Sequence, residues 1–216
     1  MSTLRFLQLL HLADSALPVG AAAHSFGLEA MVAENGLEAA GLFSFFRGYL
    51  QEAGRLDAVF VHAGYHVSSA RQWQELNEQL SAMKPARETR EASLRLGKRL
   101  AALAIEAFSI RCRYGNGPAH AAVVFGHLGH CLACPHDEVS AAYLHQSLSG
   151  LVSACQRLMP LGQSEAARLL WQLKPCVLET LAAARETDVD HVSLSQPMLD
   201  LASMRHPGLH TRLFIS

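Results

Sequence analysis

The stretch DSALPVGAAAHSFGLE, residues 14–29, follows an apolar segment at residues 4–12 and leads into a second apolar segment. Pro18 fixes its own φ and lacks a backbone donor, so no unbroken helix is expected to run through the stretch. Gly20 permits backbone conformations that other residues resist, and Gly27 stands where alanine would favour a helix by about 1 kcal/mol. A glycine among apolar neighbours indicates close approach of another backbone. The stretch therefore predicts a tight turn between helices, followed by a helix crossing.

The same stretch resembles the N-terminal signature of the UreF family of urease accessory proteins. In that signature an aspartate precedes Leu-Pro-x-Gly and then Ser-x-Gly-Leu-Glu. The matching residues here are Asp14, Leu17, Pro18, Gly20, Ser25, Gly27, Leu28 and Glu29. The chain departs from the family at Ala22, where an aromatic residue is common.

Length and composition favour one large helical domain. The chain has 216 residues, of which 50% are hydrophobic and 17% charged, against about 25% charged in an ordinary domain. A net charge of −1 removes the electrostatic case for nucleic acid or an anionic membrane as a partner. Five cysteines without framework spacing indicate reduced thiols in a cytoplasmic protein. Polar residues interrupt the first apolar run, which argues against a signal peptide.

Helical periodicity divides the chain up to residue 186 into consecutive helices. We expect helices at residues 4–12, 21–34, 38–52, 58–67, 72–83, 87–110, 119–133, 138–159, 164–173 and 175–185. The first should be short and buried, and the nearly uncharged pair 119–133 and 138–159 should form the centre of the bundle. Thr89, Ser93 and Gly97 recur four residues apart and predict a seam for close helix packing. The predicted fold is an all-α, single-domain bundle of about nine to ten helices.

The last part of the chain differs from this body. Residues 187–216 contain no sustained helical period, yet large apolar residues, Phe214 among them, gather near their end beside Arg212. An exposed tail without a role seldom keeps such residues. We therefore expect a bundle domain at residues 1–186 and a flexible C-terminal tail that orders on a partner, with Phe214 and Arg212 as its main anchors.

Three further stretches resemble the UreF family, in the order the family has them. The segment TREASLRLG, residues 89–97, carries an arginine, a small residue and a glycine at similar spacing. The family turn R-x-x-P-L-G-Q matches Arg157, Pro160, Leu161, Gly162 and Gln163. The end of the chain matches at His206, Arg212, Leu213, Phe214 and Ser216. It departs from the family's usual acidic, aromatic and basic residues at Pro207, His210 and Ile215.

The resemblance implies an all-helical, dimer-forming chaperone that is no enzyme and carries no cofactor. Family members bind UreD, also called UreH, and the GTPase UreG, and they help to load nickel into apo-urease. The implied partner-binding residues are Arg205, His206, Arg212, Leu213, Phe214 and Ser216. The implied structural residues are Asp14, Pro18, Gly20, Ser25, Gly27, Glu29, Arg157, Pro160, Gly162 and Gln163.

Two alternatives to this function remain open. One is a nickel-binding carrier that uses the His/Cys-rich helix at residues 127–136, which contains His127, His130, Cys131, Cys134 and His136. On a helix its two His–Cys pairs point about 60° or more apart, and no second Cys-x-x-Cys completes a zinc site, so we predict no resident metal. The other alternative is a helical enzyme with a pocket beside residues 14–29, although no nucleophile or metal pairs with the carboxylates there.

A second histidine pair, His62 and His66, has the i, i+4 spacing that a metal site uses. Its neighbours Phe60, Val61 and Tyr65 are apolar or aromatic. These surroundings favour packed or surface histidines over metal ligands.

Overall fold

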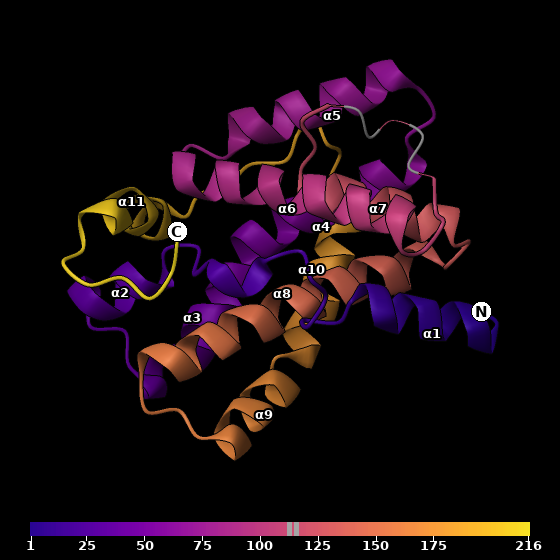
Figure 1. Ribbon diagram of the computed structural model, residues 1–216. Helices are drawn as coiled ribbons and strands as arrows, with labels where there is room; N and C mark the ends of the chain where they lie inside the picture. Colours follow the sequence, from indigo (N-terminus) through magenta and orange to yellow (C-terminus); the bar gives the residue numbers. More distant parts are fainter. Residues whose placement is uncertain (112–113, 115–116) are drawn as a thin grey trace.

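The computed structural model describes residues 1–111, 114 and 117–216, and within them it is all-α without strands, as predicted (Figure 1). The helices are α1 (Thr3–Leu12), α2 (Leu28–Asn35), α3 (Leu42–Tyr49), α4 (Arg55–His66), α5 (Ala70–Met83), α6 (Arg87–Glu106), α7 (Ala121–Cys131), α8 (His136–Leu158), α9 (Gln163–Gln172), α10 (Lys174–Arg185) and α11 (Pro197–Arg205). Short helical turns occupy Ala21–Ala23, Ala39–Gly41, Leu50–Gly54 and His206–Gly208.

Two predicted segments differ from the structure. The helix expected at residues 21–34 is broken, because Gly27 adopts a left-handed φ of 88° and α2 begins only at the next residue. The expectation that no helix follows residue 186 is wrong for α11, where Pro197 stands in the first turn. How loosely the free protein holds residues 187–216 stays a prediction.

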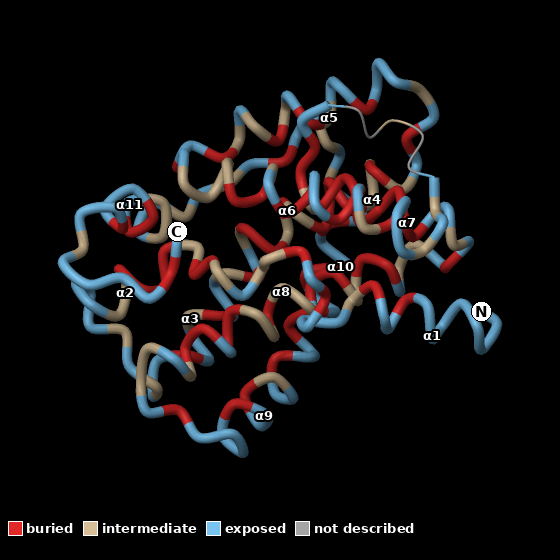
Figure 2. The backbone as a smooth tube through the Cα atoms, in the orientation of Figure 1, coloured by how far each residue is buried: buried red, intermediate tan, exposed pale blue. Residues whose placement is uncertain are grey.

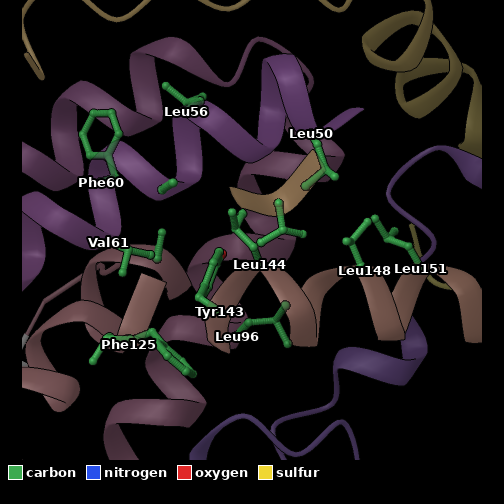
Figure 3. Packing of buried hydrophobic residues seen from close by; sticks show 14 of the residues in the cluster. Leu50, Leu56, Phe60, Val61, Leu96, Phe125, Tyr143, Leu144, Leu148 and Leu151 are labelled. Atoms are coloured by element: carbon green, nitrogen blue, oxygen red, sulfur yellow. The ribbon is translucent and has the colours of Figure 1, made fainter. Parts of the chain in front are cut away.

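The centre of the molecule is the contact between α4 and α7. A Cβ atom at Gly126 would collide with the carbonyl oxygen of Val61, so the two helix backbones lie as close as glycine allows. Every α7 residue from 122 to 129 is buried, and Figure 2 shows that burial along the helix. Phe125 packs edge-on against Tyr143 of α8 with ring centroids 5.3 Å apart (Figure 3). The prediction that α7 is central is confirmed, but α4 rather than α8 is its closest neighbour.

The predicted small-residue seam on α6 is confirmed. Ser93 Oγ lies 2.9 Å from His120 Nδ1, and Gly97 packs against the backbone at Ala119. Burial lowers the pKa of His120 to about 3, so this imidazole stays neutral in the folded protein. The seam thus fixes α6 against the start of α7.

The two ends of the chain lie on opposite sides of the molecule (Figure 1). At one end α11 packs against α2 and α6, and at the other α1 carries the N-terminus. The prediction that α1 is buried is wrong, because only Leu9 and Leu12 of this helix are buried. The described helices include none with the length and apolar content that crossing a bilayer requires.

Candidate partner interface at the C-terminal segment

One carboxylate holds the C-terminal segment, which we define as residues 196–216. Glu29, in the first turn of α2, is only 5% exposed. Its Oε2 lies 2.6 Å from His206 Nε2, and its Oε1 accepts the Leu213 N–H at 2.6 Å. The Phe214 N–H donates to Oε2 at 3.3 Å. Glu29 is thus hydrogen-bonded to both ends of the turn that follows α11.

The burial of Glu29 makes this contact costly to break. A charged group away from water needs hydrogen-bond partners, and a lost partner leaves a buried donor or acceptor unsatisfied. The position of Glu29 at the N-terminus of α2 adds a favourable helix dipole. Within the described residues, the second ring nitrogen of His206 is buried and has no hydrogen-bond partner, so Glu29 alone fixes this ring by hydrogen bonding.

The residues before α2 pair with the very end of the segment. The backbone N–H of Ser25 donates to the Ser216 carbonyl, and the Ile215 N–H donates to the Ala23 carbonyl at 2.8 Å. His24 Nδ1 lies 2.6 Å from Ser216 Oγ. Burial, and then the nearby arginines of α6, lower the pKa of His24. Backbone hydrogen bonds therefore join the stretch at residues 14–29 to the last two residues of the C-terminal segment.

Arg157, at the end of α8, is the first residue of the Arg-x-x-Pro-Leu-Gly-Gln turn. It contacts both the stretch at residues 14–29 and the C-terminal segment. Its guanidinium donates to the carbonyls of Ala22 at 2.9 Å and Leu213 at 3.3 Å. The same group lies over the Phe214 ring, 4.1 Å from its centroid, and Phe214 is only 5% exposed. In the rest of the Arg-x-x-Pro-Leu-Gly-Gln turn, Leu161 is buried, while Pro160, Gly162 and Gln163 are exposed.

Gly27 is where α11 reaches the body. A Cβ atom there would lie 2.6 Å from Ser203 Oγ and 2.9 Å from the Leu199 carbonyl oxygen. Ser203 also accepts a hydrogen bond from Thr89 Oγ1 of α6 at 3.1 Å. The predicted close approach at Gly27 is confirmed, and the approaching backbone belongs to a helix that the sequence did not predict.

The remaining signature residues shape the turn after α1. Asp14 Oδ1 accepts the Ala16 N–H at 2.8 Å, and Pro18 is exposed between buried neighbours. Gly20 has a left-handed φ of 84°, and Arg99 covers the position that a Cβ atom would take. These residues set backbone geometry, and within the described part of the chain no hydrogen bond links Asp14, Pro18 or Gly20 to the C-terminal segment.

The outer face of the C-terminal segment is apolar. Its exposed large side chains, which we call the outer stripe, are Met198, Leu201, Met204, Leu213 and Ile215. Arg212 is exposed too, and Arg205 lies 3.8 Å from Glu34. The sequence analysis missed the α11 part of this stripe, although Pro197 and the three-residue spacing of its apolar residues are signals of a helix. Of the predicted anchors, Phe214 contacts the chain's own body and Arg212 faces solvent.

The expected His/Cys-rich helix at residues 127–136 is not continuous, because α7 ends at Cys131 and His136 begins α8. His127 is buried against Trp73, and its Nε2 lies 3.8 Å from Cys131 Sγ. The Cys134 thiol instead faces the Arg5 carbonyl, and burial raises its pKa. Cys134, Cys155 and Cys176 are free thiols, while Cys112 lies outside the described residues. The described part of the chain contains no group of three His, Cys, Asp or Glu residues arranged to hold a metal ion.

The histidines of α4 have a neighbour that the sequence did not predict. The rings of His62 and His66 are 4.7 Å apart, and His136 at the start of α8 lies 5.1 Å from His62. Burial and the neighbouring imidazoles lower the pKa values of His62 and His66. Only the packing of α4 against α8 brings His136 there, so local spacing carries no signal of it.

Comparison with known proteins agrees with the resemblance. The family model described as UreF matches residues 37–174. A protein of Arthrobacter sp. (strain FB24) is 34% identical over 224 residues, which cover 97% of this chain and 96% of the relative. A protein of Corynebacterium glutamicum (strain R) is 32% identical over 220 residues, 96% of each chain. One of Paenarthrobacter aurescens (strain TC1) is 31% identical over 229 residues, 100% of each. All three relatives bear the name urease accessory protein UreF, and this chain belongs to the UreF family.

Proposed function

We propose that this protein is a non-enzymatic, cytoplasmic chaperone that acts as a homodimer in urease maturation. It binds UreD (UreH) and the GTPase UreG, and it assists the insertion of nickel into apo-urease, with nickel as cargo and not as a resident cofactor. Membership of the UreF family supports this proposal. The observation that carries it is the outer stripe of the C-terminal segment, which Glu29 and Arg157 hold against the body.

The outer stripe has the character of a protein interface. Met198, Leu201 and Leu213 are 54%, 46% and 54% exposed, and Arg212, which precedes Leu213 in the sequence, is exposed too. Interfaces are enriched in apolar side chains and arginine at positions of this kind. We assign the first contact with UreD to this stripe. The buried residues His206, Phe214 and Ser216 then act by holding the stripe in place, and they reach a partner only if the segment detaches.

A chaperone with several partners needs a second surface. Helix α1, on the other side of the molecule, exposes Leu4, Phe6, Leu7 and Leu10, with exposed fractions from 48% to 65%. No charged residue other than Arg5 lies on this helix. We propose that α1 contacts a different component of the maturation complex from the one that meets the outer stripe.

Co-purification with tagged UreD and UreG tests the proposal. Leu201→Asp places a charge in the outer stripe, and the matched control Leu178→Asp places one at a 66% exposed leucine of α10. We expect Leu201→Asp to remove UreD from the purified complex and Leu178→Asp to retain it, with both variants melting like the parent. Undiminished UreD recovery with Leu201→Asp would contradict the assignment of the stripe. Failure of the parent protein to recover either partner would contradict the proposed function itself.

A further inference from the structure

A central cavity lies beside residues 14–29, where the packed helices meet the C-terminal segment. Its volume is about 120 Å³, against roughly 10–15 Å³ for a single enclosed water. Its apolar wall includes Leu96 and Leu100 of α6 and Phe125 of α7. Figure 3 shows Leu96 and Phe125 within the buried core. Gln196 and Leu199 close it from the C-terminal segment. A concave site that combines apolar walls with a small number of polar groups is the usual form of a small-molecule site.

The polar side of the cavity is a buried ion pair. Lys84 Nζ donates to Asp57 Oδ1 at 2.9 Å, and the Tyr143 hydroxyl donates to Asp57 Oδ2 at 3.1 Å. The side chains of Lys84 and Asp57 are 8% and 13% exposed. Burial and the nearby Asp57 carboxylate raise the pKa of Tyr143, so its hydroxyl keeps its proton. The two charges cancel, and each carboxylate oxygen of Asp57 already has a donor.

Two groups at this end of the cavity, the Lys84 ammonium and the Gln196 side-chain oxygen, keep unused hydrogen-bonding capacity. An ammonium group has three donors, and among the described residues the Lys84 ammonium donates to the Asp57 carboxylate. In the described part of the chain, Gln196 Oε1 is buried without a hydrogen-bond partner. Lys84 and Gln196 both line the cavity, and both also act on the nearby Asp200 carboxyl, whose pKa burial raises. The cavity thus offers donors from Lys84 and an unused acceptor from Gln196.

We propose that the central cavity binds a small uncharged amide. Its carbonyl oxygen accepts a hydrogen bond from Lys84, and its N–H donates to Gln196 Oε1. Its short alkyl group packs against Leu96, Leu100 and Phe125. A charged ligand is disfavoured, because burying an added charge costs free energy and Lys84 already interacts with the carboxylates of Asp57 and Asp200.

The bound molecule would touch the body and the C-terminal segment together. Gln196 and Leu199 belong to the segment, whereas Lys84 and Leu96 belong to the body. Occupancy therefore stabilises the docked position of α11, in proportion to the affinity of the ligand. This inference does not depend on the proposed role in urease maturation.

Three probes of similar shape and different charge test the charge requirement. Acetamide is neutral, acetate is an anion and acetamidinium is a cation, and isobutyramide adds a larger apolar group. We expect ligand-detected NMR titrations of the full-length protein to show binding of both amides. Acetate and acetamidinium should bind at least tenfold more weakly than acetamide. Equal binding of the three charge variants, or no binding of either amide, would overturn the proposal.

A pair of substitutions tests the position of the probe. Gln196→Met removes the unused acceptor at similar side-chain length, and Gln172→Met is the control at an exposed glutamine at the end of α9. We expect isobutyramide to bind at least fivefold more weakly to Gln196→Met and equally well to Gln172→Met. Nuclear Overhauser contacts should connect the isobutyramide methyls with Leu96 or Leu100. Unchanged affinity in Gln196→Met, or contacts only to exposed leucines, would overturn the assignment.

Discussion

The contact between α4 and α7 and the joint between α2 and the C-terminal segment hold the molecule together in different ways. At the first, glycine lets two helix backbones touch, and apolar side chains such as Phe125 surround the contact. At the second, the Glu29 carboxylate, the Arg157 guanidinium and backbone groups add long-range hydrogen bonds to the close approach of α11 at Gly27. A close-packed contact is lost cooperatively when the helices separate. Hydrogen bonds of the joint can break one by one, because water replaces the lost partner. The difference predicts a body that unfolds as a unit and a segment that detaches before it.

The largest expected effect comes from breaking the helix contact. Gly126→Leu places a side chain where the Val61 carbonyl lies, and the two helices cannot separate without opening the core. We expect a loss of about 4 kcal/mol or more in unfolding free energy, measured by urea denaturation. The control Gly150→Leu alters a helical glycine that has no heavy atom within 4 Å of its Cβ position. Equal stability of Gly126→Leu and Gly150→Leu would contradict the account of the core.

A smaller loss is expected where α11 meets Gly27. Leucine there would have to adopt a left-handed φ and would meet Ser203 and the Leu199 carbonyl. Overpacking and backbone strain together predict a loss of about 3 kcal/mol, together with release of the C-terminal segment. Limited proteolysis should cut residues 196–216 in Gly27→Leu before it cuts the body. A segment as resistant as the parent's would show that the close approach does not hold it.

A still smaller effect is the pH dependence of the unfolding free energy, which we expect to arise from His120 in the body. The pKa of His120 is lowered to about 3 by burial, against 6.5 in the unfolded chain. Below pH 6.5 the unfolded state takes up this proton first, so stability falls as pH decreases toward 3 and is fully present above 6.5. Between pH 7.5 and pH 5 the loss is about 2 kcal/mol. His120→Gln should be less stable than the parent at pH 7.5 but less sensitive to acid, and an unchanged pH dependence of unfolding would contradict this assignment.

Local pattern predicted the body well, because its helices follow apolar periodicity and its close contacts occur at small residues. The seam at Ser93 and Gly97 and the approach at Gly27 were visible for that reason. The joint was not visible, since Glu29 and His206 are 177 positions apart and no local spacing connects them. Helix α11 was missed because its inner face is formed by Ala202 and Ser203, small residues that carry little hydrophobic signal. The exposure of α1 was missed because apolar spacing identifies a helix without saying what covers it.

The resemblance to a family supplied what periodicity lacked. It identified Glu29, Gly27 and Arg157 as important before any contact was known. The structure explains their spacing, because all three converge on the C-terminal segment. In the structure Phe214 is buried under Arg157, and the outer stripe is the exposed apolar surface of the segment. Binding of a partner by Phe214 stays a prediction.

Hydrogen exchange at the C-terminal segment tests the central claim, that Glu29 holds the segment independently of the core. Glu29→Gln removes the charge that three donors share, and Glu34→Gln is the control on the same helix, where the carboxylate is exposed and lies 3.8 Å from Arg205. A buried charged acceptor is worth about 1.5–3 kcal/mol. We therefore predict exchange at least tenfold faster for the amides of Leu213 and Phe214 in Glu29→Gln, with α4 and α7 unchanged and with parental rates throughout Glu34→Gln. Parental protection of these two amides in Glu29→Gln, or equal acceleration in α7, would contradict the claim.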